Sequence, residues 1–192
     1  MRRPTHRFLH ALALAALCSL PVWLAEPVQA APVPAQSEAD DPPGRVGRLS
    51  EVQGQVWLFH PQEGEWIAAE RNRPLTTGDR LASDGGARAE VQVGSTTLRL
   101  DSGTEIEVLR LDDDNLALQL HGGSVAARLR SSEQARGFEL RTGEGRFTVQ
   151  RTGRYRFDRR DENSFVTVET GQDYYEAQGS ALSVNAGQRA EF

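Results

Sequence analysis

Few side chains after residue 30 could perform acid, base or nucleophilic chemistry. Gly122-Gly123-Ser124 resembles a nucleophile elbow, in which a serine stands on a sharp turn between a strand and a helix, but another alternating stretch follows Ser124 instead of a helix. His60 and His121 fall in different predicted turns with no carboxylate at metal-ligand spacing, and we expect both to face solvent. Paired carboxylates distant in sequence stay open as an alternative, although no pair stands out. The sequence therefore predicts no catalytic residue and no enzymatic activity.

One cluster of oxygen ligands is present, at Asp112, Asp113, Asp114 and Asn115. Calcium favours such ligands, but the glycine and the terminal glutamate of a calcium-binding loop are missing, so we predict an acidic hairpin turn. The only cysteine, Cys18, lies in the apolar segment near the N-terminus, which leaves no thiolate after it for metal or redox chemistry. We expect no metal and no cofactor.

Arginine is the only basic residue apart from histidine, and it is concentrated in one region. Residues 128–160 hold 10 Arg against 4 Asp or Glu, whereas 31–127 hold 8 against 16 and 161–192 hold 1 against 6. The resulting balance of −7 after residue 30 argues against nucleic acid as a partner.

Four arginines of this region are candidate binding residues. Arg128 and Arg130 share one outward strand face, and Arg154 and Arg156 share another. Guanidinium groups suit bidentate contact with carboxylate or phosphate, so these residues fit an acidic protein surface or an anionic polymer. The alternative is a solvated face with cross-strand pairs to Glu or Asp.

The elements that must carry these side chains are strands. Apolar and polar residues alternate with a period of two, which is typical of strands buried on one face. The alternation is clearest at 87–93, 116–120, 125–129, 138–140, 147–149, 155–157 and 166–168. A change of phase in 104–111 predicts a β-bulge near Val108 or a strand buried on both faces. We expect an all-β, jelly-roll-like β-sandwich of about thirteen to fifteen short strands, with a β-solenoid-like stack as the alternative.

The first 30 residues have the pattern of a secretory signal peptide. Three arginines precede an apolar segment from residue 8 to about 25, and residues 28–30 provide a small-x-small cleavage pattern. An uncleaved membrane anchor is the alternative, against which Pro21 and the short apolar length argue. Residues 31–43, rich in proline, predict a disordered linker. The predicted organisation is a signal peptide at 1–30, a linker at 31–43 and one all-β domain at 44–192, located in the periplasm or secreted.

The stretch from residue 54 to 120 carries a more specific pattern. Its landmarks, which we expect to define the fold, are Gly54, Trp66, Gly78, Asp79, Gly85 and Gly86. The pattern resembles the FecR family of bacterial envelope domains, over roughly 44–192. The resemblance implies an all-β domain, and the best-known members relay a signal from an outer-membrane receptor to a cytoplasmic sigma factor. Only seven residues precede the apolar segment and roughly 30 follow Asp161, so we expect the anti-sigma helices and the receptor-contacting domain to be absent.

Several landmarks have a physical reason of their own. Asp79 can accept backbone N–H bonds across a tight turn, and the two glycines at 85–86 can supply the positive φ angles of a hairpin. Trp57 and Trp66 are large enough to fill much of a sandwich core. Because Trp66 precedes Ile67 in a predicted strand, one of these two must point outward, and an outward Trp66 would favour stacking on a sugar.

Two functions fit these observations. The first is a protein-binding or signal-relay module that presents an outer strand face to an envelope protein or to an anionic envelope polymer. The second is a cell-wall or glycan-binding β module, with Trp66 as an aromatic platform beside Arg128, Arg130, Arg154 and Arg156.

Overall fold

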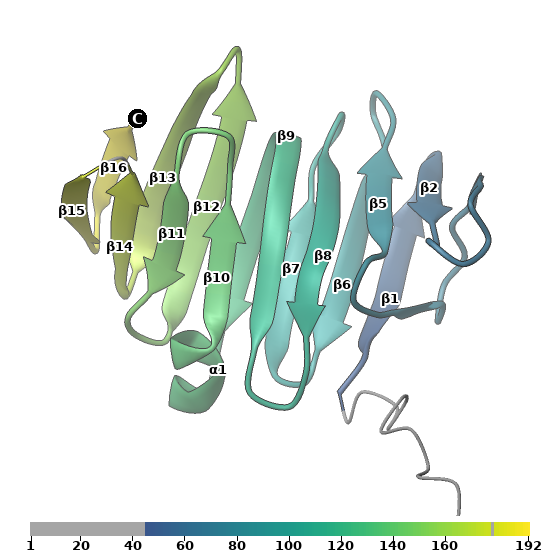
Figure 1. Ribbon diagram of the computed structural model, residues 1–192, viewed down its shortest axis with the longest axis horizontal. Helices are drawn as coiled ribbons and strands as arrows, with labels where there is room; N and C mark the ends of the chain where they lie inside the picture. Colours follow the sequence, from purple (N-terminus) through teal and green to yellow (C-terminus); the bar gives the residue numbers. More distant parts are fainter. Residues whose placement is uncertain (1–44, 178) are drawn as a thin grey trace, which may run out of the picture. The chain divides into compact units, whose positions relative to one another are not determined.

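The stretches of alternating polarity form strands, and two layers of strands enclose one apolar core (Figure 1). The computed structural model describes residues 45–177 and 179–192. The predicted signal peptide, 1–30, and the predicted linker, 31–43, lie outside these residues. Within the described ranges there are 16 strands and one short helix, so the all-β sandwich is confirmed, with more strands than predicted, and the solenoid-like alternative is not favoured.

One layer, sheet A, has the strand order β4-β1-β6-β7-β9-β12-β13-β16, and all its pairs are antiparallel. Its strands are β1 (Gly47–Gln53), β4 (Pro74–Leu75), β6 (Arg88–Val93), β7 (Thr96–Leu100), β9 (Leu116–Leu129), β12 (Gly153–Arg160), β13 (Asn163–Thr170) and β16 (Gln188–Glu191).

The other layer, sheet B, has the order β3-β2-β5-β8-β9-β10-β11-β14-β15, and its pairs are antiparallel except for β9 with β10. Its further strands are β2 (Val56–Phe59), β3 (Trp66–Ala68), β5 (Arg80–Ser83), β8 (Glu105–Leu111), β10 (Phe138–Arg141), β11 (Arg146–Val149), β14 (Gln172–Ala177) and β15 (Ser180–Asn185).

Strand β9 belongs to both layers. Its residues 116–122 pair with β8 in sheet B, and its residues 123–129 pair with β12 in sheet A. The chain passes between the layers at Gly123, where φ is +86° and an added Cβ would lie 2.5 Å from the Cα of Thr104. Just beyond, the Thr104 hydroxyl donates to the Ser124 carbonyl at 3.1 Å and accepts from the Ser124 N–H at 2.9 Å. The crossing therefore requires glycine at this position.

Aromatic rings join the two layers in the second half of the domain. Phe138 and Phe147 of sheet B face Phe157 of sheet A, with ring centroids 6.1 Å and 5.4 Å apart. All three side chains are buried, as is Tyr155, whose hydroxyl donates to the Arg151 carbonyl at 2.6 Å. These rings bury a large apolar area and fill the space between the sheets.

The expectation that Trp57 and Trp66 fill the core is wrong. Val56 and Leu58 take the inward positions of β2, so Trp57, between them, is on the outer face and is only half-buried. Trp66 is 40% exposed and is the cross-strand partner of Phe59, which is also half-buried. Adjacent residues of a strand point to opposite faces, so the inward positions of Val56 and Leu58 require Trp57 to point outward.

The predicted turns and bulge are present, with one adjustment. The register of β8 shifts just after Val108, as a β-bulge requires. The Asp79 carboxylate accepts the Thr76 N–H at 2.8 Å across its turn. Of the two turn glycines, Gly86 has a positive φ of +82°, whereas Gly85 does not.

The single helix of the described residues, α1 (Ser132–Arg136), follows β9. Its N-cap is Ser131, whose hydroxyl accepts the Gln134 N–H at 3.1 Å. Over residues 45–177 and 179–192, no helix has both the length and the apolar character needed to span a membrane.

Candidate functional site

The four arginines predicted as binding residues lie together on the outer face of sheet A. In the pairing of β9 with β12, Arg128 is directly opposite Arg154, and Arg156 is opposite Ala126. Arg130 immediately follows β9. The two strand faces that the sequence treats separately are therefore one surface, because β9 and β12 are neighbours in the sheet.

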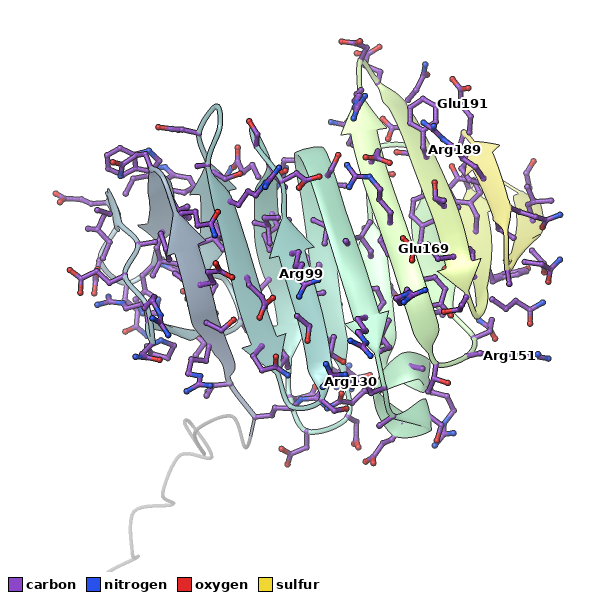
Figure 2. All side chains as sticks on the ribbon, turned by 180° about the vertical axis from the view of Figure 1, so that it is seen from behind. Arg99, Arg130, Arg151, Glu169, Arg189 and Glu191 are labelled. Carbon is purple, nitrogen blue, oxygen red and sulfur yellow. The ribbon has the colours of Figure 1, made fainter. Side chains whose placement is uncertain are left out.

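A shallow groove crosses β7, β9 and β12 on this surface, and we call it the arginine groove. It is lined by Thr97, Arg99, Ala126, Ala127, Arg128, Arg130, Arg154, Tyr155 and Glu169. Ala126 is the cross-strand neighbour of both Arg99 and Arg156, so a methyl group stands between two long side chains and leaves a depression. Figure 2 shows this face of the domain, with Arg99, Arg130 and Glu169 on it.

Arg156 is held by carboxylates of the protein itself. Its guanidinium lies 2.8 Å from Asp101 and 2.9 Å from Asp158, which is buried. Burial acts to lower the pKa of Arg156, but the hydrogen bond to Asp101 and the charge of Asp158 raise it overall. Arg156 therefore stabilises the sheet and is not a free anion-binding group.

Two arginines that line the groove itself have single carboxylate partners. Arg154 lies 2.9 Å from Glu169, and Arg99 lies 2.8 Å from Glu90. Partial burial acts to raise the pKa of Glu90, but hydrogen bonds from Arg99 and Ser50 lower it overall. These exposed pairs can exchange partners at small cost, because surface ion pairs contribute about 0–1 kcal/mol each.

Arg128 and Arg130 are exposed, and neither forms an ion pair or a side-chain hydrogen bond with any residue that the structure describes. The charge of Arg130 reaches Glu90, whose pKa it helps to lower. The groove therefore presents two guanidinium groups with uncommitted donors beside two weakly paired ones. Such an arrangement favours a ligand with carboxylate or phosphate groups.

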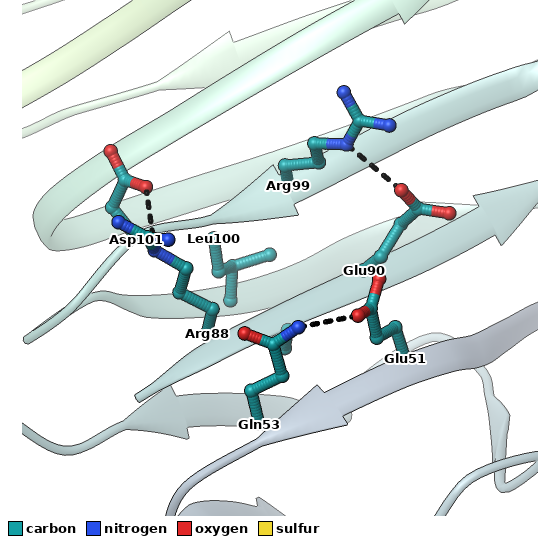
Figure 3. Close-up of a pocket in the computed structure, with 8 residues that line it drawn as sticks. Glu51, Gln53, Arg88, Glu90, Arg99, Leu100 and Asp101 are labelled. Atoms are coloured by element: carbon teal, nitrogen blue, oxygen red, sulfur yellow. Dashed lines mark hydrogen bonds and ion pairs between the residues drawn. The ribbon is translucent and has the colours of Figure 1, made fainter. Parts of the chain in front are cut away.

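An adjoining hollow on the same face is electrostatically balanced (Figure 3). Its lining consists of Glu51, Gln53, Arg88, Ala89, Glu90, Arg99, Leu100 and Asp101. Gln53 donates to Glu51 at 2.6 Å, and Arg88 lies 3.9 Å from Asp101. Charges of both signs face each other here, so this hollow does not share the excess of positive charge of the arginine groove.

Trp66 is not part of this surface. It lies on the outer face of sheet B, and the guanidinium near its ring belongs to Arg80, 5.5 Å from the ring centroid. The predicted aromatic platform beside Arg128, Arg130, Arg154 and Arg156 is therefore not formed, because the outer faces of the two layers point in opposite directions (Figure 1).

Both histidines have a carboxylate neighbour, contrary to the expectation of isolated solvent-facing residues. The Nδ1 atom of His60 contacts the buried carboxylate of Asp79. His121 lies within β9 rather than in a turn, and its Nε2 atom is 3.1 Å from the Oε2 atom of Glu107 on the neighbouring strand β8. Strand register and loop closure, which sequence spacing does not reveal, create both contacts. No group of three or more His, Cys, Asp or Glu side chains within the described ranges is arranged to hold a metal ion.

The remaining chemical motifs have structural roles. Ser124 lies inside β9, with no turn into a helix, and donates to the Oδ1 atom of Asp158 at 2.5 Å. The Asp112 carboxylate accepts the N–H groups of Asp114 at 3.0 Å and Asn115 at 2.8 Å, which closes the predicted acidic hairpin turn.

The comparisons with known proteins agree with this all-β fold. The sequence model of the family described as FecR protein matches residues 79–172, so the resemblance to the FecR family is confirmed. This segment includes β7, β9 and β12, which form the arginine groove. No curated protein matches the chain.

Two crystal structures of a proposed anti-sigma factor from Parabacteroides distasonis are similar in fold. Each has a TM-score of 0.50, with 18% sequence identity in one case and 17% in the other. The match covers 58% of this chain and 53% of the other protein, so this chain corresponds to about half of that protein's length. At this level of identity the likeness establishes the fold alone.

Proposed function

We propose that this chain is a non-enzymatic binding module of the bacterial cell envelope, exported by its N-terminal segment. The module relays a signal by holding an acidic segment of a partner protein in the arginine groove. The observation that carries this proposal is the pair Arg128 and Arg130, which present guanidinium groups without a carboxylate partner among the described residues.

The comparisons support the signalling part of this proposal. FecR proteins are envelope-associated regulators, and the structural neighbour is described as an anti-sigma factor. The groove supports the binding part, because an acidic segment would replace the exposed pairs of Arg154 and Arg99 while engaging the two free arginines. Residues 31–192 carry a net charge of −7, so the rest of the protein surface would repel acidic ligands and direct them to this groove.

Reversing the charge of the two free arginines is expected to abolish specific binding of an acidic ligand. In the full chain, we expect Arg128→Glu combined with Arg130→Glu to weaken binding of a fluorescein-labelled decaglutamate peptide by more than about tenfold at low salt, because two attractive contacts become repulsive. Fluorescence anisotropy measures the affinity.

Arg136→Glu is the matched control, because Arg136 is exposed on α1 and lies outside the groove. It should leave the affinity nearly unchanged. An equal loss with this control would show that only net charge matters and would contradict a specific groove. If the chain binds polyphosphate but not decaglutamate, the partner is an anionic polymer and not an acidic protein segment.

Export is tested separately. We expect a fusion of residues 1–43 to alkaline phosphatase to become active in the periplasm, and mass spectrometry of the exported full chain to find a new N-terminus at Ala31. Retention of residues 1–30 on the exported chain would identify this segment as an anchor, and an inactive fusion would contradict export.

A further inference from the structure

The outer face of sheet B carries a second surface feature, independent of the arginine groove. A shallow hollow there is lined by Trp57, Trp66 and Ala82. We propose that this hollow, the tryptophan hollow, is a binding subsite for a sugar ring of a neutral oligosaccharide.

The neighbours of Trp57 leave its ring uncovered. In the register of β2 with β3 and β5, the two residues directly opposite Trp57 are Ala68 and Ala82. A tryptophan flanked by large side chains would be packed on both sides, whereas two methyl groups leave the face of the indole accessible. This feature distinguishes Trp57 from the buried aromatic residues of the core, which contact other rings.

Polar contacts fix the orientation of both indoles. The Trp57 N–H donates to the Oδ2 atom of Asp84 at 3.2 Å. The Trp66 ring lies 5.5 Å from the ring of Phe59 and 5.5 Å from the guanidinium of Arg80. Arg80 is in turn paired with Glu105. The walls of the hollow are therefore held in place before a ligand arrives, which reduces the entropy lost on binding.

The chemistry of the hollow and its rim selects a sugar over other ligands. A pyranose ring has an apolar C–H face that can lie on an indole, and hydroxyl groups at its edge that need donors and acceptors. Asp84 and Glu105 provide acceptors near the rim, and Arg80 provides donors. A cationic ligand would compete with Arg80, which already lies over Trp66, and an anionic ligand would meet two carboxylates. A purely apolar partner would desolvate these charges without compensation.

The tryptophans themselves report on this site. The chain has 3 tryptophans, and the third is Trp23. In a full chain carrying Trp23→Phe, all tryptophan fluorescence therefore comes from the hollow. We expect titration with chitotetraose, cellotetraose or maltotetraose to give a saturable change in emission with at least one of them, at a dissociation constant between about 10 μM and 1 mM.

Two variants test the site in different ways. Trp66→Ala removes one wall, and Ala82→Leu fills the hollow while keeping both indoles; each is expected to weaken binding by at least about tenfold. Tyr174→Ala is the matched control, because Tyr174 is 36% exposed on β14 of the same sheet and lies outside the hollow. Because residue 82 is on the outer face, a folded Ala82→Leu protein is expected even if Trp66→Ala unfolds.

The proposal is overturned if none of the three saccharides gives a saturable change up to about 10 mM, or if Ala82→Leu binds as tightly as the parent chain. The arginine groove lies on the opposite face of the domain. A positive or negative saccharide result therefore does not affect the decaglutamate assay, which tests the proposed envelope-signalling function separately.

Discussion

Replacing Asp173 with asparagine is expected to stabilise the protein considerably more at pH 8.5 than at pH 5. Asp173 is fully buried on β14, and neither of its carboxylate oxygens accepts a hydrogen bond of normal geometry from the described residues. Burial raises the pKa of Asp173 from its ordinary 3.8 to about 7, against a small opposing effect of the Tyr174 N–H.

The sign of the pH effect follows from these two values. In the unfolded chain Asp173 loses its proton near pH 3.8, whereas in the folded protein it keeps the proton up to about pH 7. The folded state therefore binds more protons across this window, and stability falls as the pH rises from about 4 to 7. The difference between the folded and unfolded pKa values corresponds to a loss of roughly 4 kcal/mol in the free energy of unfolding above pH 7. Asparagine does not ionise and therefore avoids this loss.

Urea unfolding of both proteins at pH 5 and pH 8.5 measures the effect, because other titrating groups contribute equally and cancel in the difference. Glu176→Gln is the control: Glu176 is exposed on the same strand, and its replacement should leave the pH dependence intact. A difference between Asp173→Asn and the parent protein that is equal at both pH values would show that the buried carboxylate does not change its protonation in this range.

Replacing Gly123 with alanine is expected to lower the free energy of unfolding by at least about 3 kcal/mol. Two penalties combine at this position. A positive φ of +86° is unfavourable for a residue with a Cβ, and the added atom would lie 2.5 Å from the Gly103 carbonyl oxygen and the Thr104 Cα. Both obstacles are backbone atoms, which a rotamer change cannot move. Circular dichroism at increasing urea concentration gives the free energy.

Gly122 supplies the matched control one residue earlier in β9. An added Cβ there meets nothing within 4 Å, so we expect Gly122→Ala to change stability by less than about 1 kcal/mol. Equal effects of the two substitutions would show that the chain can cross between the sheets without a glycine. Because Arg128 follows the crossing in the same strand, Gly123→Ala should also disturb the arginine groove.

The class of fold could be predicted from the amino-acid sequence alone. Period-2 alternation identifies which residues of a strand face inward, and the buried residues Leu116, Leu118 and Leu120 follow that alternation. The phase change near Val108 is likewise local and appears as the bulge of β8. Local chemistry also determined the turns, since Asp79 and the acidic turn at Asp112 bond to backbone groups within three residues.

Which strands are neighbours could be seen only in the folded protein, and both candidate sites depend on these neighbours. The pairing of β9 with β12 places Arg128 opposite Arg154, although 23 residues, 130–152, separate the end of β9 at Leu129 from the start of β12 at Gly153. The pairing of β3 with β2 places Trp66 in the other layer, beside Arg80 rather than beside the predicted arginines. In the sequence, Asp173 is one polar residue of an alternating strand. The packing of the two sheets buries its carboxylate without a hydrogen-bond partner among the described residues. Hydrophobic alternation fixes the face of a residue, whereas its neighbours across the sheet depend on long-range register, for which a single sequence carries no local signal.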